Sequence, residues 1–265
     1  MKAFVKYWFI WKISISEALV YFLDFVGRSG FFAFIMAIYL FLWKAIYAQG
    51  DSVLDGFNLE MMIWYLVFTE MITLSTTDYY REISDDVKSG QIAYLLNKPY
   101  HYVAYCYFNQ MGKIMVRLLV NFLVGFIVAL CFVGPLDGMT PFSLAFTLLG
   151  VILGISINFF MNFALALTAF WVEENTPFRW VFQKLVFTLG GMLLPLDLFP
   201  LWLQKISIHL PFAYITYAPA KLGVAFSFSY AGQVIFGQLA YLVASILLTL
   251  FVFSKGVKKL NVNGG

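Results

Sequence analysis

The fold is decided by stretches such as residues 114–133, which read IMVRLLVNFLVGFIVALCFV and are polar only at Arg117 and Asn121. About 20 apolar residues in a helix cross a hydrocarbon core of roughly 30 Å. Comparable stretches recur along the chain, and we expect six spans over residues 31–48, 57–79, 114–133, 142–172, 178–196 and 230–253. The sequence therefore predicts an all-α integral membrane protein with one transmembrane domain, residues 1–265.

The composition supports lipid as the solvent. Hydrophobic residues make up 62% of the 265 and charged residues 12%, which leaves too little polar surface for an aqueous fold of this size. The formal net charge is only +3, and the Lys and Arg residues gather near the ends of the expected helices. Membrane lipid is thus an expected partner, and nucleic acid is not.

Two flanking segments differ from the spans. Residues 1–24 place Trp8 and Trp11 on one helical face and Lys6 opposite, which predicts an amphipathic helix in the membrane interface. No small-residue cleavage site follows, so a cleaved signal peptide is not expected. Residues 195–221 are interrupted by prolines and are expected to form short re-entrant or interfacial helices, with a long surface loop as the alternative. The residues that indicate this segment are Pro195, Pro200, Trp202 and Pro211.

Lys and Arg residues also predict the orientation. They concentrate in the N-terminal segment, in residues 81–99 and after the last span, whereas the opposite connections hold few. Short cytoplasmic loops are enriched in these residues, so both termini are expected to be cytoplasmic. Six spans satisfy that requirement, because the number must be even.

Polar side chains inside the spans are expensive in lipid and should face protein or a water-filled cavity. The candidates are Glu70, Asn109, Lys113, Arg117, Asn158 and Asn162. One interpretation is an ion pair from Glu70 to Lys113 or Arg117 that locks the second and third spans together. The other is a polar lining at the inner end of a transport route, although amides often join helices without any transport role.

The sequence offers no catalytic centre. It lacks the G-x-x-x-x-G-K-[ST] loop that cradles nucleotide phosphates, so any ATP must be hydrolysed by another subunit. His101 and His209 are the only histidines, and neither HExxH nor CxxC occurs, so no metal site is expected.

Two segments carry a family resemblance. Residues 85–99 read DDVKSGQIAYLLNKP: a charged turn, a glycine, an apolar run and a proline between the second and third spans. Gly190-Gly191 precedes a proline-punctuated segment before the last span. With six spans in addition, the chain resembles the ABC-2 type transporter permeases over nearly its whole length. Asn97-Lys98 stands where an arginine commonly precedes the proline.

The resemblance implies a permease subunit of an ATP-binding cassette exporter in a bacterial inner membrane. Such a subunit pairs with a second permease, a copy or a related chain, and separate ATPase subunits bind the ATP and Mg. An ion-coupled secondary transporter using Glu70 and Arg117, or a non-transporting membrane scaffold, are the alternatives. No residue selects a cargo.

The resemblance also assigns a role to residues 81–99 as the cytoplasmic coupling segment that docks on an ATPase. Ile83 and Val87 lie four residues apart and are expected to form an apolar stripe that anchors the segment on the ATPase, and Gly90 fits a helix C-cap. The remaining expected coupling residues are Glu82, Asp85, Asp86 and Lys88. A solvated turn is the alternative, but nineteen residues exceed what a simple connection between two helices needs.

Overall fold

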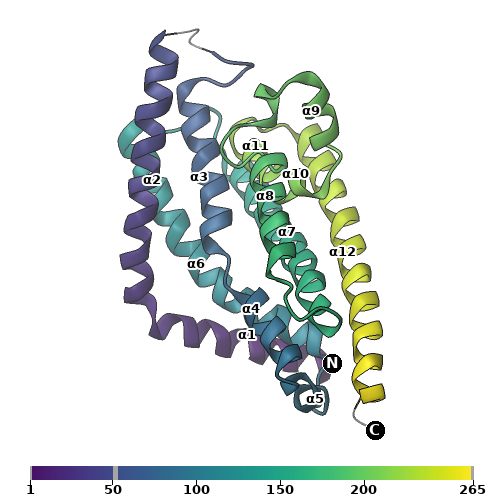
Figure 1. Cartoon of the computed structure of the whole chain (residues 1–265). Coiled ribbons are helices and arrows are strands. Elements are labelled where there is room, and N and C mark those ends of the chain that lie inside the picture. The colour runs from purple at the N-terminus through teal and green to yellow at the C-terminus, as the bar shows by residue number, and fades with distance from the viewer. Residues whose placement is uncertain (1, 50–52, 264–265) are drawn as a thin grey trace.

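The computed structural model describes residues 2–49 and 53–263, and the regular elements in those residues are helices (Figure 1). In chain order they are α1 (Lys2–Val20), α2 (Phe22–Gln49), α3 (Leu59–Ser75), α4 (Tyr79–Lys88), α5 (Gln91–Leu96), α6 (Tyr102–Val133), α7 (Pro141–Ala166), η1 (Leu167–Phe170), α8 (Thr176–Leu189), η2 (Leu196–Leu198), α9 (Leu201–Ser207), α10 (Pro211–Ile215), α11 (Tyr217–Val224) and α12 (Phe228–Asn263). The prediction of an all-helical chain is confirmed for the described residues.

Four of the expected spans are long and apolar enough to cross a bilayer. They are Gly30–Gln49 within α2, Tyr102–Val133, Pro141–Phe170 and Phe228–Lys259. The third span begins a full three turns before its expected start, because α6 continues through the polar residues near its beginning. These long helices run along the bundle in Figure 1 and make this a multi-pass membrane protein.

The other two expected spans are shorter than predicted. α3 has 17 residues, or about 26 Å, and α8 has 14, or about 21 Å. At the start of α3 the Asn58 side chain accepts a hydrogen bond from Met61 N at 2.8 Å, which caps the helix. α8 ends at Leu189, and not near residue 196, because Gly191 adopts a left-handed φ of +66°.

The core of the subunit is built around α3. Its residues are buried continuously from Met62 to Ile72, between α2, α6 and α11. Two glycines allow this close packing: a Cβ at Gly125 of α6 would lie 2.7 Å from the Phe32 ring, and one at Gly223 of α11 would lie 2.5 Å from the Phe68 ring. Small residues of this kind bring membrane helices into contact.

α1 crosses the end of the bundle where the chain ends also lie (Figure 1). It packs along α6, where a Cβ at Gly112 would lie 2.7 Å from Cβ of Ser14. Trp8 and Phe9 on its other side are exposed. The predicted helix is confirmed, and its place in the membrane interface stays a prediction.

The proline-rich segment forms the opposite end of the molecule from α4 and α5 (Figure 1). Pro195 and Pro200 stand directly before η2 and α9, and Pro211 is the first residue of α10. Trp202 in α9 is 66% exposed, whereas α11 is almost entirely buried. The short helices expected in this segment are therefore present, and the segment returns into the bundle through α11. Their position relative to the membrane stays a prediction.

Candidate functional site

The amphipathic helix α4 has one face inside the subunit and one outside. Ile83 and Val87 are only 2% and 7% exposed and pack in a cluster with aromatic residues of α6, α7 and η1. The exposed side chains are those of Arg81, Glu82, Asp85, Lys88 and Ser89. The stripe of Ile83 and Val87, expected to anchor on an ATPase, instead packs against the helix's own chain.

Hydrogen bonds fix the inner face of α4. Ser84 Oγ donates to Asn175 Oδ1 at 2.9 Å, and Tyr80 OH donates to the Asn175 carbonyl at 2.7 Å. Asn175 is 1% exposed and directly precedes α8, so it joins the start of that helix to α4. Sequence reasoning missed Asn175, because nothing in the sequence distinguishes it from an ordinary loop amide.

Asp86 is the half-buried carboxylate of α4. Tyr102 OH donates to its Oδ2 at 2.8 Å. Burial raises the pKa of Asp86 above its ordinary value, the Tyr102 hydrogen bond lowers it, and the neighbouring Asp85 charge raises it. The Tyr102 hydrogen bond therefore holds the Asp86 carboxyl group in place, while burial makes its ionisation less favourable than in water.

Gly90 provides the turn from α4 to α5. It has a left-handed φ of 75° and directly follows Ser89, the C-cap of α4. An open space surrounds the position where a Cβ would stand, so the glycine serves backbone conformation and not close packing. The helix-ending role expected for Gly90 agrees with this geometry.

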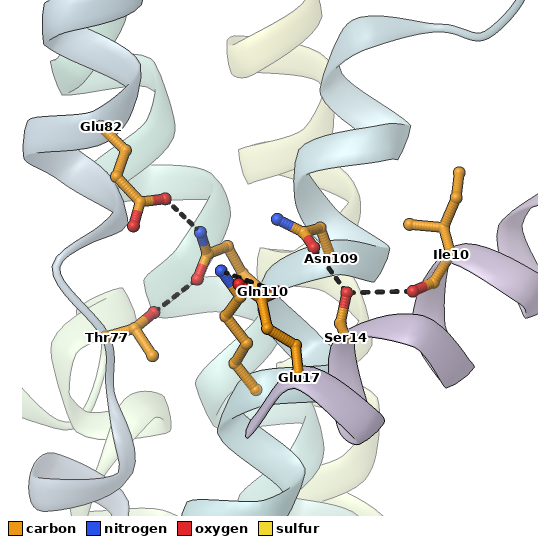
Figure 2. Close-up of polar contacts among 8 residues, drawn as sticks. Ile10, Ser14, Glu17, Thr77, Glu82, Asn109 and Gln110 are labelled. Atoms are coloured by element: carbon orange, nitrogen blue, oxygen red, sulfur yellow. Dashed lines mark hydrogen bonds and ion pairs between the residues drawn. The ribbon is translucent and has the colours of Figure 1, made fainter. Parts of the chain in front are cut away.

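A polar network joins α4 to α6 and α1 (Figure 2). Gln110 is central: its Nε2 donates to Glu82 Oε2 at 2.6 Å, and its Oε1 accepts from Thr77 Oγ1 at 2.7 Å. One residue earlier on α6, Asn109 accepts from Ser14 Oγ of α1. Gln110 is 3% exposed, and its presence inside an apolar helix is the signal that could have identified it.

The charged residues of the expected spans do not pair as predicted. Glu70 is 2% exposed and accepts a hydrogen bond from Tyr39 OH of α2 at 3.0 Å. Lys113 instead lies 3.5 Å from Glu17 of α1, and Arg117 Nη1 donates to the Thr76 carbonyl at 3.1 Å. The predicted Glu70 ion pair is wrong, because Glu70 is directed to α2 and Lys113 to α1.

A cavity of about 230 Å³ lies between α3, α4, α7 and α8. Its polar lining consists of Thr73, Thr76, Thr77, Tyr79, Tyr80, Asn158, Asn162, Arg179, Gln183, Lys184 and Thr216. Of the six polar residues expected to line a route, only Asn158 and Asn162 lie here. Asn162 Nδ2 donates to Asn158 Oδ1 at 2.9 Å, so the two amides form one polar unit of the wall.

Arg179 stands at one side of this cavity and is held by α4. Its Nη1 lies 2.5 Å from Asp78 Oδ1, and its guanidinium lies 5.3 Å from the centre of the Tyr80 ring. Within the described residues, no three His, Cys, Asp or Glu side chains gather where they could bind a metal ion. The cavity therefore offers hydrogen bonds and positive charge, the groups of a binding surface.

The four long apolar spans define the chain as an integral, multi-pass helical membrane protein. Residues 33–264 match the family model described as ABC-2 family transporter protein. The chain belongs to this family and is the membrane component of a transporter, with no ATPase domain of its own. No curated protein and no solved structure matches the chain significantly.

Proposed function

We propose that this chain is the permease subunit of an ATP-driven exporter in a bacterial inner membrane. It pairs with a second permease, a copy or a related chain, and separate ATPase subunits bind ATP and Mg²⁺ and drive the cycle. The family match over residues 33–264 supports a transporter component. We call the exposed face of α4 the drive site, the surface on which an ATPase would dock. The observation that supports it is that α4 packs against its own chain on one face and is charged on the other.

The outer face of α4 suits a soluble partner. Glu82 and Asp85 lie between Arg81 and Lys88 along this face, and all four are exposed. Charges of both signs at an interface rim give orientation and partner specificity more than raw affinity. α4 also lies at the end of the bundle that holds both chain ends, where Lys and Arg residues are concentrated (Figure 1). This placement supports a cytoplasmic position for α4 and both termini.

Hydrogen bonds from both faces of α4 provide the connection to the spans. A displacement of α4 would move Gln110 of α6 through its hydrogen bond to Glu82. It would also move Asn175, which precedes α8, through its hydrogen bond to Ser84. Tyr79 and Tyr80 of α4 also line the polar cavity. We therefore assign the cavity to the inner part of the transport route, and α4 to the element that reshapes it when the ATPases close.

Ion-coupled transport through Glu70 gains no support from this geometry. A coupling carboxylate should reach a water-accessible route, whereas Glu70 is hydrogen-bonded to Tyr39 and is not among the residues that line the cavity.

The test is co-purification with the ATPase subunits. The double charge reversal Asp85→Lys with Lys88→Glu should abolish association and transport, while the thermal stability of the permease stays unchanged because both side chains are exposed. Lys205→Glu, on exposed α9 at the opposite end, is the matched control and should leave association intact. Undiminished co-purification and transport by the double variant would refute the proposed drive site.

A further inference from the structure

We propose that the cavity between α3, α4, α7 and α8 binds the anionic headgroup of an amphiphile whose apolar part lies along α8. This inference rests on the proposed transport function and names the chemical class of ligand for the same route.

The charged residues that line the cavity are cations. Two cations, Arg179 and Lys184, line the cavity, and no lining residue is acidic. Asp78 pairs with Arg179, but its side chain is 55% exposed and lies outside the lining, so one positive charge remains when all three are counted. The Lys184 side chain is exposed and has no ion-pair partner among the described residues, so its charge is open to an anion that enters the cavity. An anionic headgroup would supply that partner.

The cavity wall also carries hydrogen-bonding groups. Asn158 Oδ1 accepts from Asn162, and the Asn158 NH₂ group donates to no atom of the described residues. Thr73 and Thr76 turn their hydroxyl hydrogens to the carbonyls of Thr69 and Thr73, so their oxygens can only accept. The wall thus combines donors for an anion with acceptors for hydroxyl groups. Such a wall suits a phosphate or carboxylate that carries hydroxyl substituents.

The same cavity also has an apolar side. Phe182, Val186 and Phe187 of α8 line it together with Ile72 and Met192. On its outer side α8 exposes Phe178, Trp180 and Val181, and Lys184 Nζ lies 5.6 Å from the centre of the Phe187 ring. The lysine therefore extends along an apolar helix with its charge at a polar cavity, as snorkelling side chains do. This junction of polar and apolar surfaces fits an amphiphile better than a free ion.

The experiment measures binding to the purified permease in phosphatidylcholine nanodiscs, by native mass spectrometry. The probes are short-chain phosphatidic acid, short-chain phosphatidylcholine and inorganic phosphate. We expect phosphatidic acid to bind about tenfold more tightly than either of the others, because only it joins a net anionic headgroup to an apolar chain. Lys184→Gln should weaken phosphatidic acid binding by about fivefold, and Lys205→Gln by less than about twofold.

Three other binding results would refute the proposed selectivity for charge, the amphiphilic ligand or the location of the site. Equal binding of the two short-chain lipids would refute selection by charge, and equal binding of phosphate would refute the amphiphile. An unchanged affinity in Lys184→Gln would refute this cavity as the site, once thermal unfolding shows that the variant is folded. Co-purification of Lys184→Gln with the ATPases is measured in parallel. Loss of co-purification would contradict the assignment of ATPase docking to α4 and of ligand binding to the cavity. Retained co-purification would support the proposed transport function independently of the lipid-binding result.

Discussion

α3 and α8 are both too short to cross a bilayer alone, yet their surroundings are opposite. α3 is buried without interruption from Met62 to Ile72, whereas Phe182 is the only buried residue of α8. In Figure 1, α3 runs between α2 and α11, and α8 lies beside α7. Helix length and apolar content therefore do not decide a helix's role; its neighbours do.

This contrast separates a fixed part of the subunit from an adaptable one. A helix enclosed by its own chain loses many contacts if it moves, while a helix with few buried contacts can shift at little cost. We assign the fixed role to α3, and the adaptable role to α8, which lines the cavity and begins beside α4.

The largest effect is expected from a matched pair of tryptophans. Trp64 of α3 is fully buried, and its Nε1 donates to the Gly134 carbonyl at 3.1 Å, whereas Trp180 of α8 is 64% exposed. Trp64→Ala should lower the free energy of unfolding by about 3 kcal/mol, because the missing ring leaves an empty space in the core and a hydrogen bond is lost. Trp180→Ala should change the stability by less than about 0.5 kcal/mol. Thermal or denaturant unfolding in detergent measures both, and equal losses would erase the distinction between α3 and α8.

A smaller effect is expected at Glu70, the polar group inside α3. Tyr39→Phe removes its hydrogen-bond donor and should cost about 1–3 kcal/mol, because a buried acceptor is left unsatisfied. Combining it with Glu70→Met should recover much of that loss, since no unsatisfied polar group remains. A double-mutant cycle with unfolding free energies measures this coupling. Strong coupling of Glu70 to Lys113, with none to Tyr39, would contradict the described arrangement.

The smallest effect is a pH dependence at Asp86, where α4 meets the bundle. The raised pKa of this carboxyl means that the folded state binds its proton more tightly than the unfolded chain does. Its contribution is therefore favourable below the ordinary carboxyl pKa and is lost as the pH rises through the raised value. Asp86→Asn keeps an acceptor for Tyr102 and should raise the unfolding temperature at neutral pH, with a gain that vanishes in acid.

The exposed neighbour Asp85 supplies the control for this pH series. Asp85→Asn removes only the smallest of the causes that shift the Asp86 pKa, so its difference from the parent protein should vary much less across the same pH range. A gain for Asp86→Asn that persisted unchanged at acidic pH would show that ionisation is not its cause.

The long spans were predictable because their apolar runs exceed the bilayer thickness. The start of α3 and the end of α8 were harder to predict. Asn58 begins α3 with a side-chain cap, and Gly191 ends α8 with a left-handed backbone, and neither is apparent from the apolar run itself. The partner of Glu70 depends on how α3 is rotated against α2 and α6, which no spacing within α3 specifies. The same limit applies to α4, where periodicity identified the apolar stripe of Ile83 and Val87 but not the side it faces.

The candidate site was predictable only in part. Asn158 and Asn162 share a helical face, and the structure places both at the cavity. Arg179 and Lys184 were not among the predicted route residues, because they reach the cavity only through the packing of α8 against α7 and α10. Gln110 and Asn175 act as connections between elements distant in sequence, and such connections are visible only after the helices have packed.

The central claim is that α4 holds its own subunit with one face and the ATPase with the other. A photo-crosslinking amino acid at position 85, 83 or 201, in the assembled complex, tests it most directly. Asp85 is exposed on α4, Ile83 is 2% exposed on the same helix, and Leu201 is 74% exposed at the opposite end. The account predicts a crosslink to the ATPase from position 85 alone. A crosslink from position 83 or 201, with none from position 85, would contradict it.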